Sequence, residues 1–399
     1  MLYAGWDWAS ESHAVTVLDQ DGKVVQRFSL RHDEAGLTDA MERLSSIAPP
    51  AELPVAIETT SGLVVDRLVR AGHPVVPIHP NAFHATRPRW GASRAKSDPG
   101  DSFKLADYLR TDGHRLRRLK PIDTSTEELQ ALVRMREDHL AARVAATNQL
   151  RALLQRHWPG AAEVFARVDS EIALAFLEDY PTPQAAAHLG EARVRMFCRR
   201  HSYCGRRSAA ELLKRLTAAP TAASALGPHV VAEAVRAQVR VLRTLLGTIA
   251  DLDRAIGAAL LVHPKAGLLE PLPRIGELNL AQIVAEVGPI LDRAVDVEHA
   301  CAEVGAGPVT RESGKGRSVH FRWAVNIRAR QALGIFADNS RHSSPWAANL
   351  YAAARARGKR HPHAIRILMR AWVRVMWACW HSETPYNPAL HGGESRIAA

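Results

Sequence analysis

Three shortages in this sequence each exclude a class of protein. Four cysteines among 399 residues are too few for a disulfide-built scaffold and indicate a reducing compartment. No uncharged stretch approaches the roughly 18 apolar residues of a transmembrane helix, so we expect no membrane span. The first residues contain no basic segment followed by an apolar one, so we expect no signal peptide and a cytoplasmic location.

Acidic residues are also scarce relative to basic ones. The chain has 52 Lys and Arg against 41 Asp and Glu, a net charge of +11. Residues 311–370 alone contain thirteen Lys or Arg and two acids, an excess equal to the charge of the whole chain. Such a concentration is typical of a protein with a polyanionic partner, nucleic acid first; a merely soluble basic protein is the alternative. The cations expected to contact nucleic acid are Arg311, Lys315, Arg317, Arg322, Arg328, Arg330, Lys359 and Arg360.

Length and pattern predict three folded segments and a tail. A chain of this length with 47% hydrophobic residues can form two or three domains, each with its own core. We expect an α/β domain over residues 1–115, a helical linker and assembly region over 116–265, a mostly helical domain over 266–390 and a loose tail over 391–399.

The first segment alternates strands and helices in the order of an RNase H-like fold. Asp21-Gly22 is a hairpin signal between two apolar runs. The predicted strands cover residues 2–6, 13–18, 24–30, 54–57 and 74–78. The predicted helices cover residues 34–47, 61–71 and 99–110. Three antiparallel strands followed by helix, strand, helix, strand and helix indicate this α/β fold class.

Two long helices are predicted over residues 125–160 and 230–262. The second repeats apolar residues at alternating intervals of four and three, at Val235, Val239, Leu242, Leu246 and Ile249. This pattern is typical of a coiled-coil seam, formed either with the first helix of the same chain or with a second chain. An ordinary amphipathic helix packed on its own domain is the alternative. No arrangement is predicted for residues 160–228.

Four carboxylates stand where they could hold a divalent cation. Asp7 and Glu58 each follow a predicted strand, and those two strands are neighbours in an RNase H-like sheet. Asp98 and Asp101 lie three residues apart at the start of a helix and share one face. Clustered carboxylates repel one another unless a cation neutralises them, and hard oxygen ligands select Mg²⁺ or Mn²⁺. The alternative is capping, with Asp98 as N-cap before Pro99 and Asp101 favoured by the helix dipole.

Two glycine-containing segments of the C-terminal part suggest contacts with phosphate. Residues 272–288 resemble a helix-hairpin-helix element, in which Gly276 would let backbone N–H groups approach a phosphate; an ordinary interhelical turn is the alternative. Residues 305–317 are expected to form a Gly-rich loop that carries Ser313 among cations. Such a serine could attack a phosphodiester, although a phosphate-binding serine is the simpler interpretation of this loop alone.

Taken together, these motifs resemble the bacterial insertion-sequence transposases of the one-ten type, relatives of the Piv DNA invertases. The resemblance covers most of the chain and is loosest over residues 160–228. The motifs that carry it are Gly5-Trp6-Asp7, Ala56-Ile57-Glu58-Thr59-Thr60, the segment Lys96 to Asp101, Pro273-Arg274-Ile275-Gly276 and the loop from Gly305 to Gly314. Three positions depart from the family pattern. Trp6 stands where the family commonly has a small apolar residue, Arg274 stands where it commonly has Gly, and the loop Val304-Gly305-Ala306-Gly307-Pro308 lacks the usual Leu after the glycine.

The resemblance implies a RuvC-like domain with a D-E-D-D carboxylate set and a C-terminal serine transposase domain. The set maps onto Asp7, Glu58, Asp98 and Asp101, and the nucleophilic serine onto Ser313. It implies a DNA transposase that cuts and rejoins strands through a covalent serine–DNA intermediate with Mg²⁺ or Mn²⁺. It also implies a structured bridge RNA as guide, a homo-oligomer (dimer or tetramer) with sites assembled between subunits, and a bacterial, nucleoid-associated location.

Two rival functions stay open at this level. A RuvC-like junction-resolving nuclease would hydrolyse DNA with metal-activated water and would need no serine. A non-catalytic nucleic-acid-binding assembly protein would need neither the serine nor the carboxylates. Substituting Ser313 or Asp7 separates the three functions.

Overall fold

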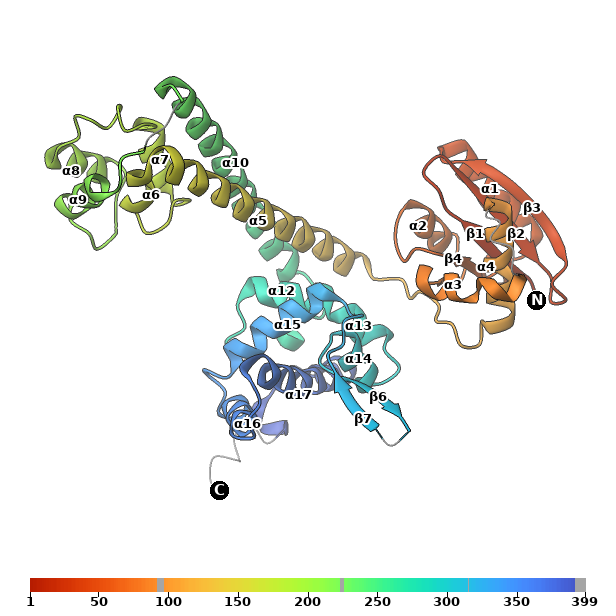
Figure 1. Ribbon diagram of the computed structural model, residues 1–399. Coiled ribbons are helices and arrows are strands. Elements are labelled where there is room, and N and C mark those ends of the chain that lie inside the picture. Colours follow the sequence, from red (N-terminus) through yellow and green to blue (C-terminus); the bar gives the residue numbers. More distant parts are fainter. Residues whose placement is uncertain (92–96, 223–225, 315, 392–399) are drawn as a thin grey trace. The chain divides into compact units, whose positions relative to one another are not determined.

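The computed structural model describes residues 1–91, 97–222, 226–314 and 316–391, and consists of two compact units, Met1–Pro121 and Ile122–Ala399 (Figure 1). The unit boundary falls six residues after the end predicted for the first domain. Within the described ranges, none of the helices combines the length and the apolar character needed to span a bilayer.

The first unit is built on a five-stranded mixed sheet (Figure 1). Its strand order is β3-β2-β1-β4-β5, with antiparallel pairing among β1, β2 and β3 and parallel pairing of β4 with β1 and β5. The strands are β1 (Tyr3–Asp7), β2 (Ser12–Leu18), β3 (Val24–Arg31), β4 (Val55–Ile57) and β5 (Val75–Pro77). The predicted order of strands and helices is confirmed, with one short helix, α3, added between β5 and the last helix.

Helices cover both faces of this sheet. Trp6 and Val15 pack with α1 and α2 on one face, whereas Ala56 and Val76 pack with α3 and α4 on the other. This division follows from the strand geometry, because successive side chains point to opposite faces. The helices are α1 (Glu34–Ile47), α2 (Leu63–Arg70), α3 (Pro80–Thr86) and α4 (Asp98–Asp112), with the 3₁₀ turns η1 (Pro50–Glu52) and η2 (Arg87–Trp90).

Helix α4 lies directly on β1 because Gly5 has no side chain. A Cβ atom at Gly5 would come closer than 3.0 Å to the backbone oxygen of Ser102 and the backbone nitrogen of Ala106. The Ser102 hydroxyl also forms a buried 2.8 Å hydrogen bond with the hydroxyl of Thr16 on β2. Gly5 therefore sets the height of α4 above the sheet.

Two long antiparallel helices, α5 (Thr124–His157) and α10 (Pro228–Leu261), organise the second unit. The start of α5 packs with the end of α10 through Leu129 and Ile256, and the opposite ends pack through Leu150 and Val235. Four of the five predicted seam residues are buried, and Leu246 is partly buried against the same cluster. The apolar stripe of α10 is therefore buried within its own chain, in part against α5, and the coiled-coil prediction stays unconfirmed.

Helical bundles lie at both ends of the α5–α10 pair (Figure 1). One bundle contains α6 (Pro159–Val164), α7 (Glu171–Asp179), α8 (Glu191–Arg200) and α9 (Ala209–Ala218). The other contains α11 (Ala266–Leu269), α12 (Glu277–Glu286), α13 (Gly288–Arg293), α14 (Val297–Glu303), β6 (Val309–Ser313), β7 (Gly316–His320), α15 (Ile327–Ser340), α16 (Pro345–Ala356), α17 (His361–Ser382) and η3 (Pro388–His391).

An ion pair between a partly exposed arginine and a buried carboxylate fixes this second bundle to α5. Arg134 donates to the Glu286 carboxylate twice, with Nε–Oε1 at 2.6 Å and Nη2–Oε2 at 3.1 Å. Asn326 donates to the same carboxylate at 3.2 Å, and the Glu286 side chain is fully buried. A bidentate pair of this kind adds orientation as well as energy, so it holds α12 and the start of α15 in place against α5.

Candidate functional site

The two carboxylates at strand ends belong to neighbouring strands and lie on the same face of the sheet. Asp7 is the last residue of β1, and Glu58 directly follows β4. The two strands are parallel, with Gly5 opposite Ala56. Because side chains alternate between faces, Asp7 lies on the face of Gly5 and Glu58 on the face of Ala56, which is the face that α4 covers. The predicted adjacency of these strands is confirmed.

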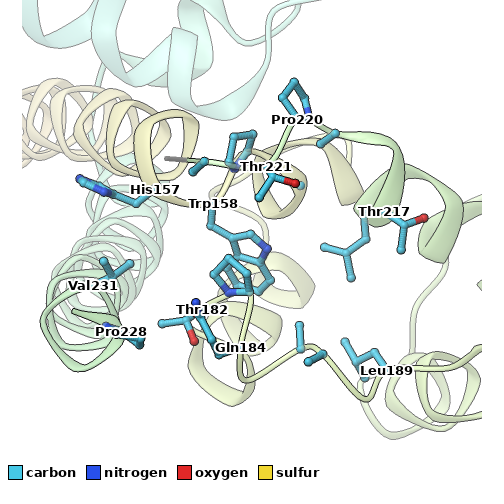
Figure 2. Close-up of a pocket in the computed structure, with 18 of the residues that line it drawn as sticks. His157, Trp158, Thr182, Gln184, Leu189, Thr217, Pro220, Thr221, Pro228 and Val231 are labelled. Atoms are coloured by element: carbon cyan, nitrogen blue, oxygen red, sulfur yellow. The ribbon is translucent and has the colours of Figure 1, made fainter. Parts of the chain in front are cut away.

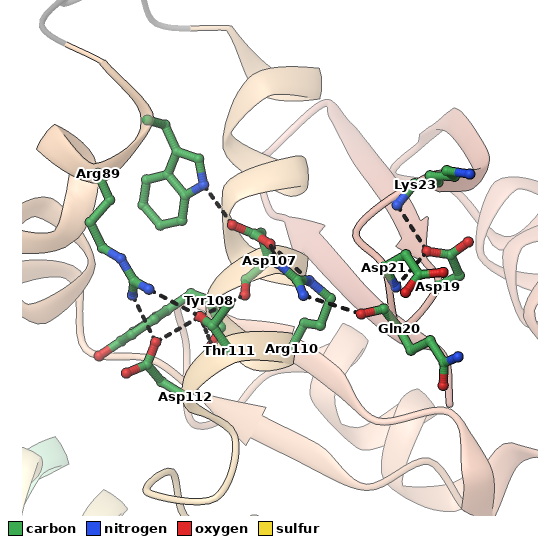
Figure 3. Close-up of polar contacts among 11 residues, drawn as sticks. Asp19, Gln20, Asp21, Lys23, Arg89, Asp107, Tyr108, Arg110, Thr111 and Asp112 are labelled. Carbon is green, nitrogen blue, oxygen red and sulfur yellow. Dashed lines mark hydrogen bonds and ion pairs between the residues drawn. The ribbon is translucent and has the colours of Figure 1, made fainter.

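Helix α4 begins at the end of the sheet where Asp7 lies. Ser102, in its first turns, sits against Gly5 in the middle of β1. Arg110, near its other end, donates from Nη1 to the carbonyl oxygen of Gln20 at 3.2 Å (Figure 3). Gln20 follows β2 beside the start of β1, so α4 runs antiparallel to β1. The first turn of α4 is therefore carried toward the strand-end carboxylates.

The first turn of α4 contains two predicted metal ligands, Asp98 and Asp101, and their environments differ. The N-cap is Ser97, whose hydroxyl accepts a backbone hydrogen bond at 3.3 Å, so the prediction of Asp98 as N-cap was wrong by one residue. Asp98 is exposed. Asp101 is 2% exposed and pairs with Arg87 at 2.8 Å and with Lys104 at 2.9 Å.

The donor chemistry of this end of the sheet fits a divalent cation. Carboxylate oxygens from strand ends and a helix start are the ligands that Mg²⁺ and Mn²⁺ prefer. In the described ranges, however, no three His, Cys, Asp or Glu side chains are gathered closely enough to form a metal site. Asp101 is neutralised instead by Arg87 and Lys104.

The pairing of Asp101 with Lys104 is predictable from the sequence, whereas its pairing with Arg87 is not. Lys104 follows Asp101 by three residues on a predicted helix, a spacing that brings side chains together. Arg87 reaches Asp101 from the η2 turn, and nothing in the local sequence pairs it with that carboxylate.

Ser313 lies on a β-hairpin and not in a Gly-rich loop as predicted. It is the last residue of β6 and pairs with Gly316 of β7, next to Gly314, whose φ of +57° suits a glycine. Ser313 is exposed, and no described residue forms a hydrogen bond with its hydroxyl. His320 pairs with Val309 at the base of the hairpin, whereas Ser313 pairs with Gly316 at its other end.

The positive charges predicted to contact nucleic acid divide into free and internally paired residues. Arg328 is paired with Glu137 and Asp138 of α5, each at 2.9 Å. Arg322 and Arg330 donate to backbone carbonyl oxygens. The charge count from sequence therefore overstates the charge available to a ligand, because it cannot include acids brought in by α5.

The other predicted cations lie near turns of the C-terminal bundle. Arg317 is exposed and pairs with Glu312 across the hairpin at 3.0 Å. Arg311 on β6, and Lys359 and Arg360 at the start of α17, are exposed. Lys315 falls outside the described residues.

In the turn before α12, the residue with a left-handed backbone conformation is Arg274 and not Gly276. Arg274 has a φ of +57°, in the left-handed region that favours glycine. Gly276 is the N-cap of α12 with an ordinary φ of −85° and open space where a Cβ would lie. The preceding helix, α11, has only four residues. The structure thus shows a tight turn leading into α12, and the helix-hairpin-helix prediction stays unconfirmed.

Five aromatic residues are interleaved with the cations of residues 311–370, and of these Trp323 is the one that is exposed: Phe321, Trp323, Phe336, Trp346 and Tyr351. Phe336 is completely buried, and Trp346 packs edge-on against Trp372 at 4.8 Å. Trp323 is 82% exposed and contacts Phe321, with 4.8 Å between ring centroids. An exposed indole beside basic residues can stack on a base.

A separate cavity of about 530 Å³ lies in the α6–α9 bundle (Figure 2). Its polar lining includes His157, Thr182, Gln184, Thr217 and Thr221, and the described residues around it include no carboxylate or thiol. It lies at the opposite end of α5 and α10 from the β6–β7 hairpin. We assign it no part in the chemistry of the carboxylates or of Ser313.

Comparisons with known proteins match both units. Residues 4–159 match a model of DEDD transposases of the IS110 type, and residues 266–352 match the transposase IS116/IS110/IS902 family. A candidate mini-circle transposase for IS117 from Streptomyces coelicolor is 32% identical over 399 residues, covering 97% of this chain and 95% of the relative. An uncharacterised 44.8 kDa protein of IS116 from Streptomyces clavuligerus is 26% identical over 400 residues, covering 97% and 96%.

A third relative, an uncharacterised 42 kDa protein of IS900 from Mycobacterium paratuberculosis, is 25% identical over 393 residues, covering 97% of this chain and 98% of the relative. The DEDD match indicates an RNase H-like fold for the first unit and the use of a divalent metal. Transposases bind DNA and transfer its strands. The chain belongs to the IS110/IS116/IS902 family of insertion-sequence transposases, and it is a DNA strand-transfer enzyme.

Proposed function

We propose that this transposase cuts and rejoins DNA through a covalent serine–DNA intermediate. Asp7, Glu58, Asp98 and Asp101 hold Mg²⁺ or Mn²⁺, and Ser313 is the nucleophile. The observation that carries the proposal is the position of α4, whose first turn starts at the end of β1 on the face that bears both strand-end carboxylates. A bound divalent cation stabilises the charge that develops on a phosphate under attack.

The exposure of Ser313 suits the role of nucleophile. Its hydroxyl stands next to the turn of a two-stranded hairpin, where no described side chain competes for it, so a DNA backbone can approach. In the proposed step, Ser313 Oγ forms a bond to phosphorus and the bond from phosphorus to the 3′-oxygen breaks. The serine loses one proton and the 3′-oxygen gains one.

The adduct preserves the energy of the phosphodiester. A 3′-hydroxyl from the exchanged strand attacks the serine–phosphate ester, forms a new phosphodiester and returns the proton to Ser313. One ester replaces another in each step, so no ATP or other co-reactant is consumed.

Sequence specificity comes, in this proposal, from a structured guide RNA encoded by the element. The supporting observation is that the described ranges hold no cluster of His, Cys, Asp or Glu suited to a zinc finger. The basic residues around the hairpin would then contact backbones without reading bases. Digestion of a co-purified nucleic acid with RNase, followed by loss of site-specific cleavage, tests this part.

The covalent adduct is the direct test of the chemistry. The protein is incubated with DNA that spans the element and its flanks, denatured without protease, and probed for DNA attached to protein. We expect an adduct that Ser313→Ala abolishes. Ser318→Ala is the matched control, because Ser318 lies on the other strand of the same hairpin and bonds to His320.

The carboxylates are tested with the same assay. Asp7→Ala, or chelation of divalent ions, is expected to reduce the adduct by at least about 100-fold, since an electrostatic contribution to a transition state commonly accounts for that much. Cleavage that persists in Ser313→Ala and still requires the metal would replace this proposal with a hydrolytic RuvC-like nuclease.

A further inference from the structure

A basic pocket at the base of the β6–β7 hairpin is not used by the chemistry proposed above. It is an open cavity of about 620 Å³. One wall is the end of β7 with Phe321 and Arg322, and the opposite wall is one face of α17. His363, Arg366 and Arg370 line that face at intervals of three and four residues, the spacing that aligns side chains along a helix.

The pocket contains more cationic than acidic side chains. The guanidinium carbons of Arg330 and Arg366 lie over the Phe321 ring, 4.6 and 5.1 Å from its centroid. In the described part of the chain, neither of these arginines nor Arg322 pairs with a carboxylate. Two further arginines of the lining, Arg370 and Arg374, do have an acidic partner, since both pair with Glu298.

Burial makes this excess of charge unfavourable in the free protein. Burial lowers the pKa of Arg366, and burial together with the neighbouring Arg366 lowers the pKa of Arg330. The Nε atoms of Arg330 and Arg370 are buried without a described hydrogen-bond partner. Arg330 still donates to the carbonyl oxygen of Arg322 and Arg370 pairs with Glu298, so Arg366 is the cation of this group that has no polar partner among the described residues. A partly desolvated cation of that kind is costly, and cation–π contact with Phe321 offsets only part of that cost. An anion with several acceptor oxygens would supply the missing partners.

We propose that this pocket binds a backbone phosphate of the DNA strand on which Ser313 acts, with Arg366 and Arg322 as its ligands and His363 at its edge. The inference rests on the proposed function, because it takes the polyanion to be the reacting strand. The guanidinium groups match the geometry of phosphate oxygens. Trp323, exposed and in contact with Phe321, offers a stacking surface to a neighbouring base.

The hairpin sets the distance between this phosphate and the reacting one. Val309 at the base and Ser313 at the tip are four residues apart on β6, which corresponds to about 13 Å at roughly 3.3 Å per residue. That span equals about four nucleotide steps of one strand of a duplex. The pocket would therefore anchor the strand a few nucleotides from the cleavage point and fix its register against Ser313.

The test measures binding of a fluorescein-labelled 30-base-pair DNA duplex of arbitrary sequence by the full-length protein over a range of salt concentrations. Each phosphate contact adds about 0.9 to the slope of log Kd against log salt concentration. We expect Arg366→Gln to reduce that slope by about 0.9 and to weaken binding roughly tenfold. Arg366→Lys keeps the charge and is expected to keep the slope. Arg254→Gln, which removes an exposed α10 cation paired with Asp251, is the matched control.

Thermal unfolding separates this role from a structural one. Because Arg366 is an unneutralised, partly buried charge, Arg366→Gln is expected to leave the melting temperature unchanged or to raise it. A slope equal to that of the wild type would overturn the proposal, as would a melting temperature lowered together with binding. If Arg366→Gln lowered the affinity for an RNA duplex and left DNA binding intact, the proposed ligand would be wrong and the pocket would be assigned to RNA. The assay needs no cleavage, so failure of the adduct experiment would not affect its reading.

Discussion

Arg274 is a residue whose backbone conformation suits glycine. Its φ of +57° lies in the region where an L-residue with a Cβ is disfavoured by roughly 1–2 kcal/mol. Arg274→Gly is expected to raise the free energy of unfolding by about 0.5–1 kcal/mol, the remainder being lost to the larger backbone entropy of glycine in the unfolded chain. Urea unfolding followed by circular dichroism measures this change.

A suitable comparison is Arg274→Ala, which removes the side chain but keeps the Cβ and its strain. Equal stability of the Gly and Ala variants would show that the effect comes from the arginine side chain and that the left-handed backbone costs nothing.

At this scale the sequence predicted the identity of residues better than their partners. The positions of Asp7 and Glu58 at strand ends were predictable because strand ends can be read from apolar runs, and their shared face follows from strand alternation. Their role as metal ligands stays a prediction. The ion pair between Asp101 and Arg87 could not be found, because the two residues approach only after α4 folds onto the sheet. Likewise, the strained residue of the turn before α12 could not be told from the letters Pro-Arg-Ile-Gly, in which glycine is the obvious candidate.

The contact between α4 and β1 is the element-level feature on which the carboxylate site depends. Gly5→Ala would place a Cβ closer than 3.0 Å to backbone atoms of Ser102 and Ala106, which cannot rotate away. We expect a loss of about 3 kcal/mol in the stability of the first unit, at the upper end of overpacking costs, and loss of the covalent adduct as the first turn of α4 shifts.

Gly190→Ala is the control for this substitution. Gly190 has an ordinary φ of −106° and open space at its Cβ position, so this variant should match the wild type in stability and adduct yield. A Gly5→Ala protein with normal stability and normal adduct yield would show that α4 can move without disturbing the site.

Elements with a buried face were predictable, whereas exposed ones were not. The strands of the first unit show apolar runs because helices cover both faces of the sheet, and α10 shows apolar periodicity because one side of it is buried. In contrast, β6 and β7 are exposed along nearly their whole length, so they have no alternation to detect. Their segment was therefore interpreted from its glycines as a loop, although Gly314 is the turn residue of a hairpin.

The distribution of charge is a property of the whole molecule that a sequence window misjudges. Arg328 is counted among the excess cations of its segment, yet its partners Glu137 and Asp138 lie about 190 positions earlier in the chain. Conversely, Arg366 keeps its charge unpaired on a half-buried helix face. The basic surface that binds nucleic acid is therefore smaller than the count suggests and is defined by which cations lack acids after folding.

The carboxylates and Ser313 belong to different compact units of the chain, Met1–Pro121 and Ile122–Ala399, which makes it possible for two chains to share a site. If each site combines the first unit of one chain with the second unit of another, Asp7→Ala and Ser313→Ala chains should complement each other. Co-expression at equal levels in a two-fold symmetric dimer makes half of the dimers mixed, and one of the two sites in each mixed dimer is intact, so the adduct should recover to about a quarter of the wild-type yield.

The complementation is measured with differently tagged chains, and the adduct should form only on the Asp7→Ala chain, because that chain alone retains Ser313. Each variant expressed by itself provides the background. Sites formed within single chains would give no recovery at any ratio of the two variants, since every site would then lack either Asp7 or Ser313. A null result with both tags recovered in one complex therefore places the carboxylates and the serine of each site on the same chain.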